Sequence, residues 1–331
     1  MTISQLSARL NLSICTISKI LNRSFEGVTY AEGTIRRVEA AAIKFGYSPN
    51  VHARSLRTKR SMTIGMVVPA GIPYFTGSLV ESIEGALRPL GFETFISHST
   101  SDTVKEAHLI NNIIGRGVDG LMLIPYSTGL SASELQIPAK FPLILLDRPG
   151  FNGRFPAVMT DNRGACRELA ARIVDAGQKS VTVLSSDCGD LSISERAQGV
   201  SDVYGSRMKS VNAPNERGAA CLVVSKLLNK MAGQTLICLT ESLALGALRA
   251  IRDRGLEIGR DIGFACFDDL PLCDIWQPSI CRIEQDIEGL GREAVRLLVE
   301  KIQSPATKQS LEIRIPARLI WGDSVLPSKA R

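Results

Sequence analysis

From residue 63 onward, short apolar runs alternate with segments of helical periodicity, and this alternation limits the folds open to the chain. The runs TIGMVV (63–68), VDGLMLIP (118–125) and TLICL (235–239) are almost wholly apolar. Strands that are apolar on both sides are typical of parallel sheets, and parallel strands need a crossover segment, usually a helix, between them. The pattern therefore predicts an α/β fold with parallel sheets.

Two series of strands and helices follow one another along this part of the chain. In the first, Phe75, Leu79, Ile83, Leu87 and Leu90 recur at helical spacing after the first strand. Further strands of the first series fit 92–97 and 142–147, with a helix at 104–116. The second series has helices at 163–176, 194–204, 216–230, 242–254 and 286–303. Its strands fit 180–185, 207–211, 235–239 and 262–267. This length exceeds one ordinary core, so we expect two doubly wound lobes with a ligand site between the carboxyl ends of their strands.

The first 60 residues have a different pattern, which predicts three short helices. Thr2 and Gln5 fit a capping box, and Asn11 tolerates the left-handed conformation that a tight turn needs. Ser13 can cap a second helix at 14–21, and a third helix fits 31–45. The side chains expected to pack inward are Ile3, Leu6, Leu10, Ile17, Ile20, Leu21, Val38, Ala42 and Phe45. Two short helices joined by a tight turn and followed by a third describe a helix-turn-helix unit.

The positive charge of the chain is concentrated in the same 60 residues. They contain ten Lys or Arg and three acidic residues, whereas the formal net charge of all 331 residues is +6. The remaining residues therefore carry a net charge of −1. A basic, folded head on a near-neutral body is typical of a polyanion-binding domain and disfavours the alternative of a solubilising tail.

Composition argues against several other classes of protein. No apolar run is long enough to cross a membrane and MTISQLSARL is unlike a signal peptide, so we expect a cytoplasmic, nucleoid-associated protein. The eight cysteines form no CxxC pair and there are three histidines, so neither a metal site nor a cofactor is expected. Cysteines within LICL and FACF are expected to be buried thiols. No phosphate loop or nucleophile motif is evident, so we do not expect an enzyme or any catalytic residue.

Three segments resemble the signatures of the lactose-repressor (LacI/GalR) family of bacterial regulators. NLSICTISKILN (11–22) is similar to the recognition-helix signature of that family, although Asn11 and Lys19 depart from its usual Gly and Arg. GYSPN (46–50) and ARSLRTKRSMTIGMVVP (53–69) are similar to the next two signatures. Further landmarks follow in the body: DGLMLIP, LLDRP, ERAQG, LALGALRA, FDDLPL and IEQDIEGLGREAVRLL. The resemblance implies a periplasmic-binding-protein-like body of type I.

The patterns and the resemblance together predict an all-α helix-turn-helix head on an α/β body of two doubly wound parallel-sheet lobes. We expect a DNA-binding domain at 1–48, a hinge helix and linker at 49–61, and a ligand-binding and dimerisation domain at 62–331. Its N-lobe is expected to comprise approximately 62–160 and 286–308, and its C-lobe approximately 161–285 and 309–325.

The resemblance also implies roles for residues of the head. The residues expected to contact DNA are Thr2, Ser13, Ile14, Cys15, Thr16, Ser18, Lys19, Asn22, Tyr47, Asn50, Ala53 and Leu56. Ile14, Cys15 and Lys19 fall at positions that read base edges, and the hydroxyl side chains beside them fall at positions that contact phosphate. Leu56 falls where the family inserts a leucine into the minor groove. The alternatives are core packing for Ile14 and a linker role for Leu56.

The same resemblance places candidate ligand contacts in the cleft, each just after a strand or at the start of a helix. They are Phe75, Tyr126, Asp147, Arg148, Arg196, Thr240, Asp268 and Gln285. An aromatic face stacks on a ring, carboxylates accept hydrogen bonds from hydroxyl groups, and Arg donates in a planar fork, which suits a small hydroxylated ligand. The alternatives are core packing for Phe75, a turn cap for Asp147 and a surface salt bridge for Arg196.

The cleft also departs from the family pattern at three places. Thr240-Glu241 replaces the usual Asn-Asp, Ala213 stands where some members have an aromatic wall, and Ala70 replaces the usual acid. These departures predict a remodelled pocket.

The expected function is that of a ligand-responsive, sequence-specific repressor that binds a near-palindromic operator as a homodimer. Helix 13–21 would enter the major groove, the hinge at 51–57 would contact the minor groove, and a sugar or sugar derivative in the cleft would switch the protein. A nucleobase or nucleoside effector is the alternative within this class, and a sugar receptor or an enzyme are alternatives outside it. A periplasmic receptor would need a signal peptide and no basic head, and the absence of C-terminal leucine heptads favours a dimer over a tetramer.

Overall fold

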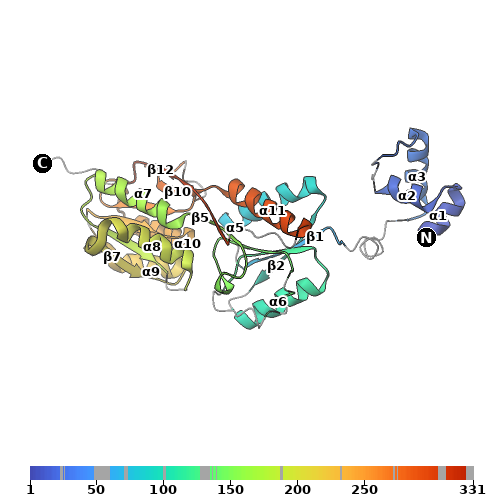
Figure 1. Ribbon diagram of the computed structural model, residues 1–331. Coiled ribbons are helices and arrows are strands. Elements are labelled where there is room, and N and C mark those ends of the chain that lie inside the picture. The colour runs from blue at the N-terminus through green and yellow to red at the C-terminus, as the bar shows by residue number, and fades with distance from the viewer. Residues whose placement is uncertain are drawn as a thin grey trace. The chain divides into compact units, whose positions relative to one another are not determined.

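The computed structural model describes the whole chain except residues 23, 24, 26, 48–59, 71–73, 100–101, 127–134, 136, 139, 187–188, 232, 271–272, 274, 305–310 and 326–331. Its contacts divide it into two compact units, Met1–Ser61 and Met62–Arg331, called the head and the body below (Figure 1). The hinge helix expected at 51–57, with Asn50, Ala53 and Leu56, lies outside the described residues.

The head has helices α1 (Ile3–Leu10), α2 (Ile14–Leu21) and α3 (Glu32–Lys44). The predicted caps are confirmed, because Thr2 and Gln5 form a capping box at α1 and the Ser13 hydroxyl accepts from the Thr16 amide at α2. Asn11 ends α1 at φ 53° and ψ 45°, in the left-handed region. The core of the head consists of Leu6, Ile17, Ile20, Val38, Ala41 and Ala42.

The first lobe of the body is built on a sheet in the order β11-β5-β4-β3-β1-β2. Its strands are β1 (Thr63–Pro69), β2 (Glu93–Ser99), β3 (Gly120–Leu123), β4 (Leu143–Leu146), β5 (Ala157–Thr160) and β11 (Glu312–Ile315), and they pair in parallel. Its helices are α5 (Tyr74–Leu87), α6 (Thr103–Gly115) and α11 (Ile287–Gln303), with short 3-10 helices η1 (Arg88–Leu90) and η2 (Phe151–Gly153). Side chains of α5 and α11 share one apolar cluster with the sheet, and those of α6 share another.

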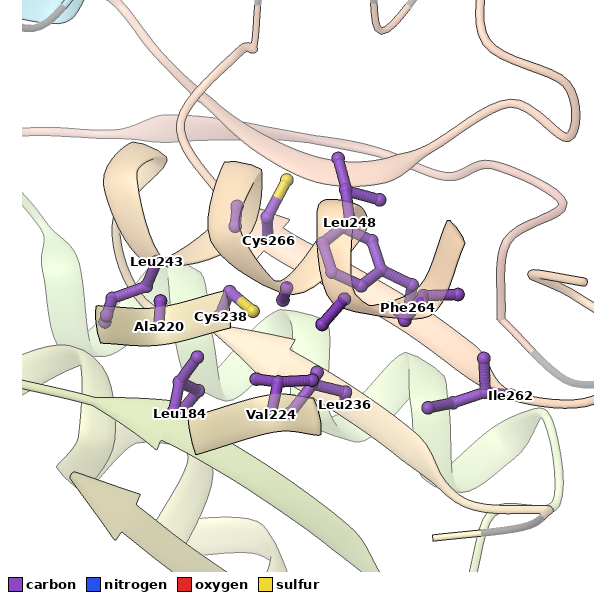
Figure 2. Close-up of a cluster of buried hydrophobic side chains, with 14 of the residues drawn as sticks. Leu184, Ala220, Val224, Leu236, Cys238, Leu243, Leu248, Ile262, Phe264 and Cys266 are labelled. Carbon is purple, nitrogen blue, oxygen red and sulfur yellow. The ribbon is translucent and has the colours of Figure 1, made fainter. Parts of the chain in front are cut away.

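The second lobe has a sheet in the order β12-β10-β9-β8-β6-β7. Its strands are β6 (Val181–Ser185), β7 (Met208–Asn212), β8 (Thr235–Cys238), β9 (Gly263–Phe267), β10 (Cys281–Gln285) and the antiparallel β12 (Ala317–Ile320). Its helices are α7 (Asn162–Asp175), α8 (Leu191–Tyr204), α9 (Arg217–Leu227) and α10 (Glu241–Asp253), with 3-10 helices η3 (Gly205–Arg207) and η4 (Leu228–Lys230). Figure 2 shows the apolar cluster that α9 and α10 form with this sheet, in which Phe264, Leu236 and Cys238 are fully buried.

The two sheets repeat one topology. In each, the second strand of the lobe lies outside the first, and the later strands continue on the other side of the first. This is a doubly wound order with its switch point between β1 and β3 in one lobe and between β6 and β8 in the other. Ligands of such folds bind beyond the carboxyl ends of the strands at the switch point. The predicted fold class is confirmed.

One domain assignment was wrong. Residues 309–325 were all expected in the C-lobe, but β11 (Glu312–Ile315) pairs with β5 in the first-lobe sheet. Only β12 belongs to the second-lobe sheet, where it pairs with β10. The chain therefore passes between lobes near 161, 286 and 316. Strands β5, β10, β11 and β12 were not predicted, because each is short and its periodicity is weak beside the long apolar runs.

Some side chains lie differently from expectation. Leu90 is the last residue of η1 and is 48% exposed, so it does not continue the apolar stripe of α5. Cys15 is exposed, whereas Cys238 and Cys266, of the LICL and FACF runs, are fully buried as predicted.

Among the described residues, no helix is both long and apolar enough to span a membrane.

Candidate functional site

Two carboxylates begin the candidate site, one from each lobe. Asp147 follows β4 and Asp268 follows β9, so the two residues occupy equivalent positions in the repeated topology. Both have a left-handed backbone, with φ of 66° and 82°. Asp adopts this conformation more readily than most residues, and such backbone often marks functional turns.

A cavity of about 80 Å³ lies where these strand ends meet. Seven of the eight residues predicted as ligand contacts line it: Phe75, Asp147, Arg148, Arg196, Thr240, Asp268 and Gln285. The eighth, Tyr126, does not line this cavity and is 41% exposed. Its backbone N–H donates to Glu106 Oε1 on α6 at 2.8 Å, which holds Tyr126 to that helix.

The cavity also has lining residues that the sequence did not single out as ligand contacts. They are Thr76, Asp190, Ile193, Asn215, Glu241 and Ser242. Asp190 follows strand β6 and caps α8, and Glu241 opens α10 after β8. The rule that located Asp147, an acid just after a buried strand, would have located both of them.

Arg196 is a buried cation rather than a surface ion-pair partner. It is 5% exposed, and its Nε and Nη1 atoms donate to Asn162 Oδ1 at 2.8 Å and to the Leu239 carbonyl oxygen at 2.9 Å. Its guanidinium carbon lies 3.6 Å from the centroid of the Phe267 ring. These contacts fix the guanidinium in one orientation at the cavity wall.

A hydrogen-bonded chain links Asp268 to the segments that pass between the lobes. Gln285 Nε2 donates to Asp268 Oδ1 at 2.6 Å, and the Thr160 hydroxyl donates to Gln285 Oε1. Thr240 caps α10, and its hydroxyl donates to Asn215 Oδ1 at 2.7 Å. The polar groups of the cavity are therefore held in place by neighbours on other elements, as a preorganised binding site requires.

Besides the Thr160–Gln285 hydrogen bond, four direct contacts join the lobes around the cavity. Arg148 Nη1 lies 2.8 Å from Asp190 Oδ2, and the Ser192 hydroxyl donates to the Asp147 carbonyl oxygen at 2.9 Å. The amide of Tyr74 donates to Glu241 Oε2, also at 2.9 Å. The fourth contact is bidentate, between Arg314 on β11 and Glu195 on α8, at 2.8 and 2.9 Å. The lobes are thus closed on each other by the protein's own side chains.

A second, larger hollow of about 780 Å³ shares Phe75, Asp268 and Gln285 with this cavity. Pockets that enclose small organic ligands usually measure about 300–1,000 Å³, so 80 Å³ alone is too small for a sugar. A ligand of that size needs either partial opening of the cross-lobe contacts or extension into the larger hollow. Phe75 stands on the shared wall and also packs against the first-lobe core, which is the alternative role offered for it, and its contact with a ligand stays a prediction.

Those predicted DNA-contacting residues that the structure describes lie at or near α2 and the ends of α1 and α3. Ile14 is 46% exposed and Cys15 is exposed, whereas Ile17 and Ile20 are fully buried. Core packing is therefore not the role of Ile14 within the head. Lys19 is half-buried on the same helix, and Tyr47 packs against the core of the head.

The polar side chains of this surface already have partners within the head. The hydroxyl groups of Ser13 and Thr16 lie 2.8 Å apart, and Asn22 Nδ2 donates to the Ser18 carbonyl oxygen at 2.7 Å. The Thr2 hydroxyl accepts from the Gln5 amide. These contacts cap the N-terminal turns of α1 and α2.

Comparison with known proteins matches both a part of the body and nearly the whole chain. Residues 192–325 match a family model described as a periplasmic binding protein-like domain. Catabolite control protein A of Priestia megaterium is 24% identical over 336 residues, which cover 98% of each chain. The catabolite control protein A of Staphylococcus aureus strain Mu50 is 22% identical and covers 92% of this chain and 94% of its own.

Solved structures show the same fold along the whole length. The lac repressor dimer bound to operator and the anti-inducer ONPF superposes with a TM-score of 0.81 at 21% identity, covering 98% of this chain and 99% of that one. The transcriptional regulator CelR in complex with cellobiose gives a TM-score of 0.71 at 21% identity, with the same coverage.

Fold and site together define a helix-turn-helix head carried on a periplasmic-binding-protein-like body. The relatives that match this combination over nearly the whole chain, catabolite control protein A and the lac repressor, are transcription regulators. The chain is thus similar to LacI-family transcriptional regulators, to relatives of 22–24% sequence identity and in fold to the lac repressor.

Proposed function

We propose that the protein is a repressor that binds a near-palindromic operator sequence-specifically, as a homodimer, and is switched by a small molecule in the interlobe cleft. The observation that carries the proposal is the convergence of seven predicted side chains from both lobes on one cavity, in a chain whose head exposes the outer face of α2. A ligand that alters lobe closure can act on DNA binding only if it binds the two closure states with different affinity.

The exposed face of α2 supports major-groove contact. Ile14 and Cys15 present an apolar surface suited to a thymine methyl group, and Lys19 presents a cation suited to guanine acceptors. The ten basic residues of the first 60 supply the charge that attracts phosphate.

The lining of the cleft supports a hydroxylated effector. Carboxylates, two guanidinium groups and two amides can each bind hydroxyl groups, and Phe75 can stack on a ring. Phe75 is the single aromatic residue among the described residues that line the cavity, and Ala213 is buried in the second-lobe core. A flat nucleobase held between two aromatic rings is therefore disfavoured relative to a sugar or sugar derivative.

Binding to DNA fragments from the gene's own neighbourhood tests the proposal. Affinity, measured by fluorescence anisotropy, should fall steeply with salt, because each phosphate contact adds a slope of about −0.9 to log K against log salt. Deletion of residues 1–60 should abolish binding. A full-length chain that binds no such fragment, or binds all DNA with equal affinity, would contradict the proposal.

A further inference from the structure

The interlobe cavity holds more buried carboxylates than buried cations. Asp147, Asp190, Glu241 and Asp268 all line it, and their side chains are 7–11% exposed. Among the described residues, Arg148 and Arg196 are the cations that line it, with side chains 18% and 6% exposed. Four buried acids therefore share two buried guanidinium groups.

Two of the acids are well compensated. Arg148 Nη2 lies 3.1 Å from Asp147 Oδ2, and its Nη1 lies 2.8 Å from Asp190 Oδ2. Both distances are within hydrogen-bond range, so one guanidinium bridges the two carboxylates.

Glu241 and Asp268 are not compensated in this way. Arg196 Nη1 is 3.9 Å from Asp268 Oδ2, and this nitrogen already donates to the Leu239 carbonyl oxygen. Arg217 Nη2 is 3.7 Å from Glu241 Oε1, but the Arg217 side chain is 68% exposed, so solvent screens its charge. Buried carboxylates without a close cation are unfavourable. A cavity with two of them is therefore suited to a ligand that carries a positive charge.

The adjoining hollow has the same excess of negative charge. Its charged lining residues are Glu81, Asp268, Asp269, Glu284, Asp286, Glu288 and Arg318. Arg318 pairs with Glu284 at 2.5 Å and Arg282 pairs with Asp269, which leaves the other acids without a cation from the hollow's own lining.

An ammonium group suits this place better than a metal ion. Among the described residues, no group of three or more His, Cys, Asp or Glu is arranged to hold a metal. An ammonium group carries three hydrogen-bond donors and can be shared by two carboxylates. Thr240, Gln285 and Arg196 remain beside it for hydroxyl groups, with the Phe75 ring on the wall.

We propose that the effector is a hydroxylated primary amine, of the amino-sugar class, whose ammonium group lies between Glu241 and Asp268. This rests on the proposed function, because it takes the interlobe cleft as the effector site. Burial raises the pKa of the Glu241 carboxyl above its ordinary value, and the nearby negative charge of Asp268 raises it further, as expected for an acid that lacks a counter-ion.

Thermal unfolding of the full chain tests the proposal with matched compounds. A panel of amino sugars, such as D-glucosamine and D-galactosamine, is compared with the neutral parent sugars and the N-acetylated forms at equal concentration and salt. A bound ligand raises Tm in proportion to the logarithm of its concentration over Kd. We expect at least one amine to raise Tm where its neutral counterparts do not.

Two isosteric variants locate the amine. Glu241→Gln and Asp268→Asn should each weaken binding of that amine by about tenfold or more, as measured by calorimetry. Asn tolerates the left-handed backbone of position 268, so the second variant keeps the turn. Asp253→Asn, on the exposed face of the same helix as Glu241, removes an equal charge and should leave amine affinity unchanged.

Three results would overturn the proposal. They are stabilisation by a neutral sugar equal to that by its amine, no stabilisation by any amine of the panel, and amine binding that survives both variants. Operator binding is measured in parallel on the same preparations. Loss of the amine effect with specific DNA binding intact removes this inference alone, whereas absence of specific DNA binding removes the proposed function.

Discussion

Single residues in this protein show how local chemistry sets backbone and exposure. Asn11, Asp147 and Asp268 all adopt positive φ, and all belong to the small group of residues that tolerate it. Asn11 ends a helix, whereas the two Asp residues turn the chain directly after a strand and bring a carboxylate to the cleft. The same conformational tolerance thus serves a turn in the head and a binding site in the body.

Ile14 and Ile17 lie on the same helix and should respond differently to truncation. Ile14→Ala removes an exposed probe and should lower discrimination at one operator base pair by about 1 kcal/mol, with other positions unchanged. Ile17→Ala empties a fully buried site, at a cost of about 2–5 kcal/mol to the fold of the head, and should weaken binding to all sequences alike. Binding to a library of operator variants measures both. A base-preference profile for Ile14→Ala that superposes on the wild type would mean that Ile14 reads no base.

The difference in stability between the Glu241→Gln variant and the wild type should depend on pH. Burial raises the pKa of Glu241 in the folded state, so the wild type loses stability as pH rises through that pKa, and Gln does not. The variant should therefore have the higher Tm at neutral pH, and the difference should shrink as pH falls and Glu241 becomes protonated. Both Trp residues, Trp276 and Trp321, lie in the body, so Trp fluorescence reports its unfolding.

Asp253→Asn is the control, because the pKa of Asp253 is shifted in the opposite direction to that of Glu241. A hydrogen bond from Arg252 lowers the pKa of Asp253, so that its stabilising effect is present at neutral pH and is lost as pH falls through its folded-state pKa. Its variant should be no more stable than the wild type at neutral pH. A Glu241→Gln variant that is less stable than the wild type throughout would show that the bond from the Tyr74 amide outweighs burial.

At the scale of elements, two glycines allow pairs of helices to pack closely. A Cβ added at Gly199 in α8 would collide with the Arg163 carbonyl oxygen on α7, and one added at Gly246 in α10 would collide with that of Arg217 on α9. Both glycines belong to sequence landmarks, ERAQG and LALGALRA, by which the chain resembles the LacI/GalR family. The landmarks therefore mark helix contacts, in addition to neighbouring cleft residues.

Gly246→Ala should destabilise the body despite the better helix propensity of Ala. Displacing backbone in a packed helix pair costs about 1–3 kcal/mol, or roughly 2–4 °C of Tm per kcal/mol in a domain of this size. Gly218→Ala, on α9 with open space around it, should instead gain up to about 1 kcal/mol. Thermal unfolding followed by Trp fluorescence compares the two. Equal gains from both substitutions would show that the helices separate freely.

At the scale of the whole molecule, polar contacts between the lobes close the body around its cleft. Arg148–Asp190 and the Glu241–Tyr74 bond lie at the cavity, and Arg314–Glu195 lies beside it with more exposed side chains. Interactions of this kind break at modest cost when a ligand offers replacements. The arrangement therefore suits a body that switches between closed and open states.

Arg148→Met should open the ligand-free body. It leaves Asp147 and Asp190 buried without their shared cation, and breaking a buried ion pair costs about 3–5 kcal/mol, which separation of the lobes relieves. Small-angle X-ray scattering should show a larger radius of gyration than for the wild type. Arg314→Gln, in a partly exposed pair worth about 0–1 kcal/mol, is the control. An unchanged radius in both variants would mean that Arg148 does not hold the lobes together.

Much of the site could be predicted because the rules that locate it are local. Asp147 and Asp268 follow strands that are recognisable as apolar runs, and the carboxyl ends of parallel strands mark the ligand side of the sheet. Tyr126 satisfied the same rule, yet its segment is bonded to Glu106 on α6, a contact between residues twenty positions apart that no local pattern shows.

The sequence by itself determined the head with its caps, the α/β class of the body, its two series of strands and most of the cleft. Each of these depends on periodicity, turn chemistry or charge within short stretches of chain. Only the tertiary structure decided that β11 joins the first lobe, that Asp190 shares Arg148 with Asp147, and that Glu241 and Asp268 lack a close cation. These features depend on which distant segments meet and how deeply they are buried. The balance of acidic and basic side chains in the cavity is set only when those segments come together in the folded chain.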